Sequence, residues 1–113
     1  MMPPSQADVY IAIGHTDMRK SINGLCQLVN DNFDSDIFSG NLFAFCNRRR
    51  DIIKILFWDY NGFCIWHKRL ENDQFRWPKS EREVIYINSQ QMSWLLAGLD
   101  IETAHKQLTY SEI

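Results

Sequence analysis

The sequence lacks the short motifs that mark common catalytic and cofactor-binding sites. Gly14 and Gly62 belong to no GxGxxG or phosphate-loop pattern, and no serine lies in a nucleophile-elbow context. The cysteines form no CxxC pair, and the histidines have no metal-ligand spacing to each other or to a cysteine. The acidic residues show no pairing suited to acid–base or two-metal chemistry. We therefore expect a protein that is not an enzyme and that uses no cofactor and no metal.

Long apolar segments are also missing. No apolar run approaches the length of about 18 residues that a membrane helix needs, and Met1–Pro4 lacks the basic and apolar regions of a signal peptide. The odd cysteine count is typical of free thiols in a reducing compartment, with Cys26 and Cys46 among apolar neighbours. These features predict a cytoplasmic protein with no membrane partner.

The composition is that of one small folded domain. The chain has 113 residues, of which 45% are hydrophobic and 13% aromatic. Its net charge is −2, but residues 48–82 carry nine bases against five acids, whereas both flanking segments are acidic. We expect a single domain over residues 1–101 and a C-terminal tail, 102–113, that forms at most a frayed helix. A basic segment in an acidic protein indicates one local surface that faces an anion.

The basic segment reads as a long antiparallel ribbon. Apolar runs at Ile52–Trp58 and Phe63–Leu70 flank Asn61-Gly62, a dipeptide that favours a type I′ hairpin turn with φ > 0 at both residues. On the first strand, the side that carries Lys54 is expected to be the more exposed. On the second strand, alternation alone leaves open which side chains face the core.

The remaining elements follow from periodicity. Strands are predicted at 8–13, 42–46, 74–77 and 84–87. A first helix is predicted with Thr16 or Asp17 as its cap, and a second one runs from a cap at Asn88 or Ser89 through Ala97. The buried stripe of the first helix consists of Met18, Ile22, Leu25, Val29 and Phe33. The fold class is therefore α+β: a mostly antiparallel sheet of five to six strands with two main helices on one face.

The candidate binding residues are the cations of the ribbon and of the first helix. They are Arg48, Arg49, Arg50, Lys54, Lys68, Arg69, Arg76, Arg19 and Lys20. Arg19 and Lys20 in a first helical turn would form a phosphate site with the free N–H groups, but pairing with Asp17 or exposure to solvent is the favoured interpretation. For the ribbon, an ordinary solvated strand face is the alternative to a binding surface. The tryptophans are expected mainly in the core, with stacking on nucleic acid as the alternative.

Several segments resemble the motifs of a known family, in the same order. Asp17–Leu25 resembles TDMRKGIDGL, and Asn47–Asp59 resembles NRRRDRLKLLYWD. Arg69–Glu71, Phe75–Pro78 and Leu95–Asp100 complete the set. Over about residues 9–101, the chain resembles the TnpB (second open reading frame) accessory proteins of the "sixty-six" group of bacterial insertion sequences.

This resemblance implies a bacterial accessory protein of transposition, encoded beside a separate transposase that carries out the strand chemistry. It supplies no catalytic residue. The implied partner is the transposase or a sister accessory protein, contacted through the basic aromatic ribbon, and the alternative partner is DNA at the element ends. The chain departs from the family pattern at Ser21, Cys64 and His67. Neither the sequence nor the resemblance indicates an oligomeric state.

Overall fold

The computed structural model describes residues 8–78 and 84–96. Within them the chain order is β1 (Val9–Ala12), α1 (Ile22–Asn32), β2 (Leu42–Cys46), β3 (Ile52–Asp59), β4 (Gly62–Arg69), β5 (Val84–Ile87) and α2 (Ser89–Leu96). The α+β class is confirmed. The predicted charged loop at 79–83, the end of the second helix at Ala97 and the C-terminal tail lie outside the described residues.

The strands form one mixed sheet with the order β4-β3-β2-β1-β5. β1 and β2 pair in parallel, with Val9 opposite Leu42, whereas the other three pairings are antiparallel. The parallel pair arises because the chain passes through α1 between β1 and β2, so both strands run in the same direction. Their C-terminal ends, at Ala12 and Cys46, therefore meet at one edge of the sheet.

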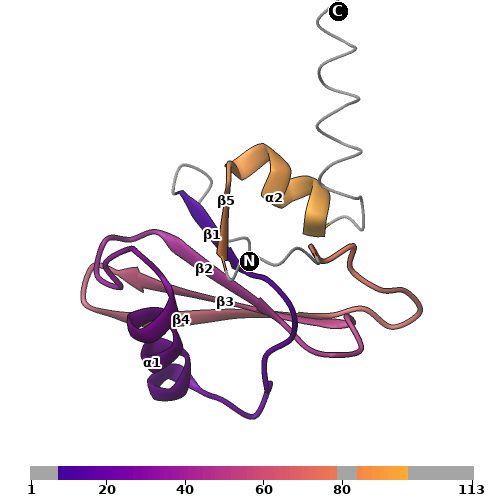
Figure 1. The fold of residues 1–113 in the computed structure, drawn as a ribbon, viewed down its shortest axis with the longest axis horizontal. Coiled ribbons are helices and arrows are strands. Elements are labelled where there is room, and N and C mark those ends of the chain that lie inside the picture. Colours follow the sequence, from indigo (N-terminus) through magenta and orange to yellow (C-terminus); the bar gives the residue numbers. More distant parts are fainter. Residues whose placement is uncertain (1–7, 79–83, 97–113) are drawn as a thin grey trace, which may run out of the picture.

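The two helices cover opposite faces of the sheet (Figure 1), which corrects the prediction that both lie on one face. Residues Leu25, Val29 and Phe33 at α1 pack with Phe43, Phe45 and Leu56. On the other face, Met92 and Leu95 of α2 join a cluster that includes Ile53 and Ile55. All five residues of β2 are buried because each face of this central strand has its own cover. The side of β3 that carries Lys54 packs against the α1 cluster at Leu56. It is still the more exposed side, as predicted, because Lys54 and Trp58 are partly exposed whereas Ile53 and Ile55 are buried.

The first helix begins later than predicted. Ser21 is its N-cap, without a side-chain capping bond, and Met18–Lys20 lie in the preceding turn. The Asp17 carboxylate instead accepts a hydrogen bond from the Arg19 backbone N–H at 2.9 Å, which stabilises a turn and not a helix start. The predicted stripe is confirmed at Leu25, Val29 and Phe33, which are all buried.

The hairpin turn is shifted by one residue from the prediction. Asp59 pairs with Gly62, so Tyr60 and Asn61 form the loop. Tyr60 has φ of 56°, whereas neither Asn61 nor Gly62 has a positive φ. The type I′ turn at Asn61-Gly62 is therefore wrong. The register that pairs Trp58 with Phe63 brings both rings into a cluster with Phe38, and this cross-strand packing outweighs the preference of the Asn-Gly dipeptide.

The predicted strand at 74–77 is also wrong. Residues 74–77 have no strand assignment, although Phe75 and Trp77 are buried, with 1% and 4% of their surfaces exposed. Their rings fill the core on the α2 face, and the Trp77 indole donates to the Ala12 carbonyl oxygen at 2.8 Å. Buried and exposed residues alternate over 74–77 because the two aromatic side chains pack into the core. Within the described residues, the backbone of this segment does not pair with a neighbouring strand. Pro78, which has no N–H, ends the segment.

Candidate partner-binding site

A short loop, Asn47–Asp51, carries three adjacent arginines between β2 and β3. The Asn47 side chain organises it: its Oδ1 accepts hydrogen bonds from the backbone N–H groups of Asp51 and Ile52, each at 3.0 Å. Its Nδ2 donates to the Asp51 carboxylate at 2.7 Å. The side-chain amide of Asn47 therefore satisfies backbone N–H groups that lose their strand partners where the chain turns. We call Asn47–Asp51 the basic loop.

The backbone of the basic loop is also tied to the segment that follows β4. The Phe75 N–H donates to the Arg50 carbonyl at 2.6 Å, and the Gln74 side chain donates to the Arg49 carbonyl at 2.7 Å. A third bond joins the Leu70 N–H to the Asp51 carbonyl at 2.7 Å. Backbone groups and the Asn47 and Gln74 side chains hold this loop, so its fold does not depend on the guanidinium groups.

The side chains of the three arginines lie at the surface. Arg48 and Arg49 are exposed and Arg50 is partly exposed. Arg48 Nη2 lies 3.5 Å from His15 Nε2. Within residues 8–78 and 84–96, the structure shows no side-chain hydrogen bond or ion pair of Arg49 or Arg50. Arg50 has φ of 61°, a left-handed conformation that costs an L-residue about 1–2 kcal/mol.

Three of the other predicted cations are engaged within the fold. Lys54 Nζ donates to the carbonyl oxygens of Met18 and Lys20, at 2.8 and 3.0 Å, and so holds the turn before α1. Arg19 pairs with Asp17 at 2.7 Å, as the favoured interpretation predicts, and Arg69 pairs with Glu71 at 3.1 Å. Hydrogen bonds from the Arg19 side chain, and then from its backbone, lower the pKa of Asp17 to about 2.

The predicted set does not form one continuous surface. Strand alternation places Lys54 and its cross-strand neighbour His67 on the α1 face, whereas Lys68, opposite Ile53, points to the other face. Arg76 is exposed on the irregular segment after β4, and Lys20 is exposed before α1. Arg48, Arg49 and Arg50 are the predicted residues that one loop brings together.

Comparison with known proteins places this architecture in a family. The model of the family described as IS66 Orf2 like protein matches residues 7–106. The chain belongs to this family. It is accordingly a transposition-associated accessory protein, and the resemblance of the sequence motifs to this family is confirmed.

Two relatives of this IS66 Orf2-like chain come from Sinorhizobium fredii. The protein named "Uncharacterized protein y4hO" is 39% identical over 101 residues, covering 88% of both chains. "Uncharacterized protein y4jC" is 31% identical over 101 residues, which covers 88% of this chain and 86% of the relative. No solved structure gives a significant match.

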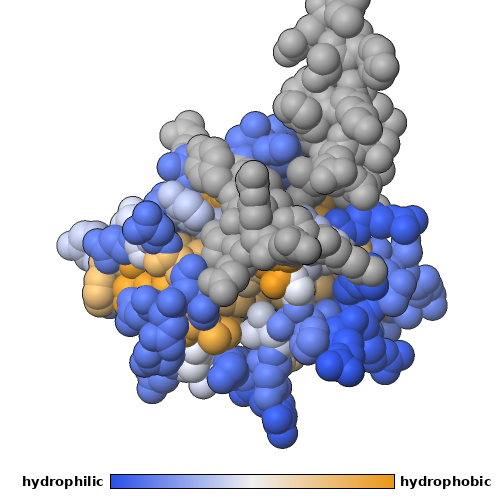
Figure 2. Space-filling view, in the orientation of Figure 1, coloured by the Kyte–Doolittle hydropathy of each residue, from blue (hydrophilic) through white to orange (hydrophobic). Residues whose placement is uncertain are grey.

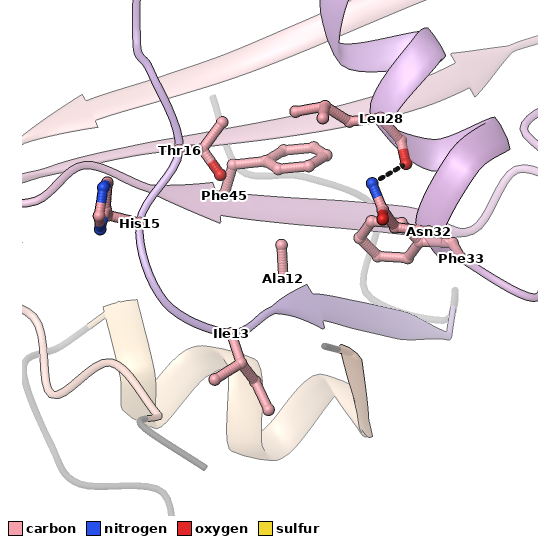
Figure 3. A pocket seen from close by; sticks show the side chains of 8 residues that line it. All are labelled: Ala12, Ile13, His15, Thr16, Leu28, Asn32, Phe33 and Phe45. Carbon is pink, nitrogen blue, oxygen red and sulfur yellow. Dashed lines mark hydrogen bonds between the residues drawn. The ribbon is translucent and has the colours of Figure 1, made fainter. Parts of the chain in front are cut away.

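Two pockets in this family member differ in their distance from the basic loop. One, of about 230 Å³, lies between α1 and the end of β1, and Figure 3 shows the rings of Phe33 and Phe45 at it. Asn32 Nδ2 points to the Leu28 carbonyl there and donates to it at 3.1 Å, so this amide is already used. Its lining contains no lysine, arginine or carboxylate.

The other pocket, of about 350 Å³, lies beside the basic loop and is lined by Arg49 and the acidic residues Asp51, Glu71 and Asp73. Across residues 8–78 and 84–96, no group of three or more His, Cys, Asp or Glu side chains is arranged to hold a metal ion. No helix in those ranges has the length and apolar character required to cross a bilayer.

Sequence reasoning missed the neighbours of the basic loop. In the sequence His15 has no metal-ligand spacing, and the tryptophans are predicted mainly in the core, with stacking on nucleic acid as the alternative. The structure shows that His15 and Trp77 line a pocket with Arg48 and Arg50. The signal that places them together is the parallel pairing of β1 and β2, which brings the loops after both strands to one edge. The isolated periodicity of each strand does not reveal that pairing.

Proposed function

We propose that this protein is a non-catalytic interaction module of insertion-sequence transposition, which docks on the element's transposase through the basic loop. The observation that carries the proposal is that Arg48–Arg50 lie together on one loop, whereas three of the other predicted cations have partners within the chain. Lys54, Arg19 and Arg69 have partners within the chain, whereas the loop arginines are displayed on a backbone that does not need them. Arginine suits this role because its planar fork of donors matches a carboxylate in a fixed geometry.

The arrangement of charge favours a protein partner. Tight non-specific DNA binding rests on a track of cations that neutralises about 6–10 phosphates along the duplex. Here the cations lie on both faces of the sheet, and those with internal partners would have to give them up. The net charge of −2 also opposes the approach of a polyanion. A localised basic loop suits a small acidic surface on a folded partner.

DNA at the element ends is the second candidate, favoured by the three adjacent arginines. Arg48, Arg49 and Arg50 are able to contact phosphates as well as carboxylates. If DNA is the partner, replacing all three should reduce the slope of log affinity against log salt by up to about three units, at about 0.9 per lost phosphate contact.

The experiment is co-purification with the neighbouring transposase, with and without labelled element ends. The test variant is Arg48→Ala/Arg49→Ala/Arg50→Ala. The control variant is Arg19→Ala/Arg69→Ala/Arg76→Ala, which removes the same amount of charge elsewhere. We expect the test variant to lose the transposase and the control to retain it, with little DNA bound by either one.

Two results would contradict the proposal. Capture of the transposase by the folded test variant at the wild-type level would show that the basic loop is only a solvated turn. Salt-sensitive binding of element ends by the wild-type protein alone, lost in the test variant, would establish the DNA candidate instead.

A further inference from the structure

One pocket joins three segments that are far apart in the sequence. Gly14 and His15 come from the connection after β1, Asn47, Arg48 and Arg50 from the basic loop, and Trp77 from the segment after β4. The pocket measures about 270 Å³, a little below the range of about 300–1,000 Å³ that is typical of drug-sized ligands. It has room for one side chain or a small anion.

The segments that form this pocket are fastened to each other. The Thr16 N–H donates to the Cys46 carbonyl at 2.7 Å, which holds the residues after β1 against the end of β2. The Trp77 indole reaches back to the Ala12 carbonyl at 2.8 Å, and the Phe75 N–H binds the Arg50 carbonyl. The backbone of the pocket is therefore preorganised, so a ligand has to order only the arginine side chains that bind it.

The chemistry of the lining is amphipathic. Arg48, Arg50 and His15 bring side chains that can donate hydrogen bonds, and Pro78 brings apolar surface. Trp77 adds only a small apolar area, because its side chain is 4% exposed. No carboxylate lines the pocket. The neighbouring acid, Asp51, accepts a hydrogen bond from Asn47 at 2.7 Å. The lining therefore combines unneutralised cationic donors with an apolar wall.

We propose that this pocket binds the carboxylate side chain of an acidic residue, above all glutamate, presented by a partner protein. Its carboxylate would accept hydrogen bonds from Arg48 and Arg50, and its methylene groups would pack on Pro78 and on the small exposed part of Trp77. A phosphate group has no apolar stem to use the Trp77 and Pro78 surface. This inference rests on the proposed docking function and names the chemistry of the contact.

The test uses the full chain and short synthetic peptides, observed through the side-chain NMR signals of His15 and Trp77. The probes are an uncharged-end peptide with one central Glu, the same peptide with Gln, inorganic phosphate and a DNA duplex. We expect the Glu peptide to shift both signals saturably and to bind at least tenfold more tightly than the Gln peptide. Arg48→Ala/Arg50→Ala should lose that preference, whereas Arg19→Ala/Arg69→Ala should keep it.

Equal responses to the Glu and Gln peptides would overturn the pocket proposal, as would an unchanged preference in the Arg48→Ala/Arg50→Ala variant. Tighter binding of phosphate or duplex at the same two signals would show that the pocket is a phosphate site. If the pocket selects Glu but the protein captures no transposase, the pocket proposal holds and the docking function is refuted. If the protein captures transposase but the pocket does not select Glu, the docking function holds and the pocket proposal is refuted.

Discussion

Arg50 has the left-handed backbone conformation within the basic loop, with φ of 61°. Glycine adopts this conformation without the steric cost that a side chain incurs, although it also gains entropy in the unfolded chain. We expect Arg50→Gly to unfold with a free energy about 0.5–1 kcal/mol higher than Arg50→Ala. Both variants lose the same cation, so both should capture less transposase. Urea titration of the pair measures the stability difference.

If the two Arg50 variants are equally stable, the backbone strain is absent. If Arg50→Gly captures transposase as well as the wild-type protein, the guanidinium group has no part in docking. The pair thereby separates the conformation of this residue from its charge.

The hairpin tip offers a second residue-scale test. Tyr60 combines φ of 56° with a side chain that is 93% exposed, so its ring contributes little packing to offset the strain. Tyr60→Gly should raise the free energy of unfolding by about 0.5–1 kcal/mol. Gly62 has no positive φ, and a Cβ there would meet nothing within 4 Å. Gly62→Ala should therefore leave stability unchanged or raise it by up to about 1 kcal/mol. Thermal unfolding of both variants tests the register.

The opposite pattern, in which Gly62→Ala is clearly destabilising and Tyr60→Gly is neutral, would restore the predicted turn at Asn61-Gly62. That result would also change the register in which β3 and β4 pair.

At the scale of the elements, Lys54 connects β3 to the turn before α1. Its ammonium binds two carbonyl groups that precede the helix. Lys54→Met keeps the unbranched apolar stem, one atom shorter, but leaves both acceptors without this donor, and should lower the free energy of unfolding by about 1–3 kcal/mol. Chemical denaturation measures the loss. Lys20→Met, which removes an exposed cation from the same turn, should change stability by less than about 0.5 kcal/mol.

Similar effects of Lys54→Met and Lys20→Met would show that Lys54 is not a structural bridge. Lys54 would then return to the set of cations available to a partner, and the cations open to a partner would extend beyond the basic loop.

Across the whole molecule, the two ends of the sheet differ in character. Figure 2 shows hydrophobic surface toward the end where the β3–β4 turn lies, and strongly hydrophilic surface toward the end with the basic loop. Phe38 and Tyr60, both exposed aromatic residues, lie at the first end. The partner-binding proposals concern the second end, where the connections after β1, β2 and β4 meet.

The buried thiol of Cys46 reports on the stability of the whole fold. Burial raises the pKa of Cys46 to about 12, from an ordinary value of 9.0. Between these values the unfolded chain releases a proton that the folded chain retains, so stability should fall as the pH rises from about 9 toward 12. We expect Cys46→Ala to show a shallower fall, measured by urea titration at several pH values. A slope identical to that of the wild-type protein would contradict this assignment.

Much of this protein follows from local sequence patterns. The stripe of Leu25, Val29 and Phe33 predicts the buried side of α1. Asn88 is a correct cap, since it accepts from the Gln91 N–H at 2.8 Å while Gln91 accepts from the Asn88 N–H. Such features depend on a few adjacent residues, so they can be predicted from the sequence without knowledge of the tertiary structure. The linked motifs also identify the family.

The tertiary structure decided which face each helix covers and which cations have partners. Lys54 meets the Met18 carbonyl across 36 positions of sequence, and His15 meets Arg48 across 33. Both contacts exist because α1 carries the chain across the sheet and leaves β1 and β2 parallel, with their ends adjacent. Local propensity does not encode that pairing, which is stabilised by the packing of both sheet faces. The sequence by itself determined most of the elements and the position of the arginines, and the crossover through α1 determined what surrounds them.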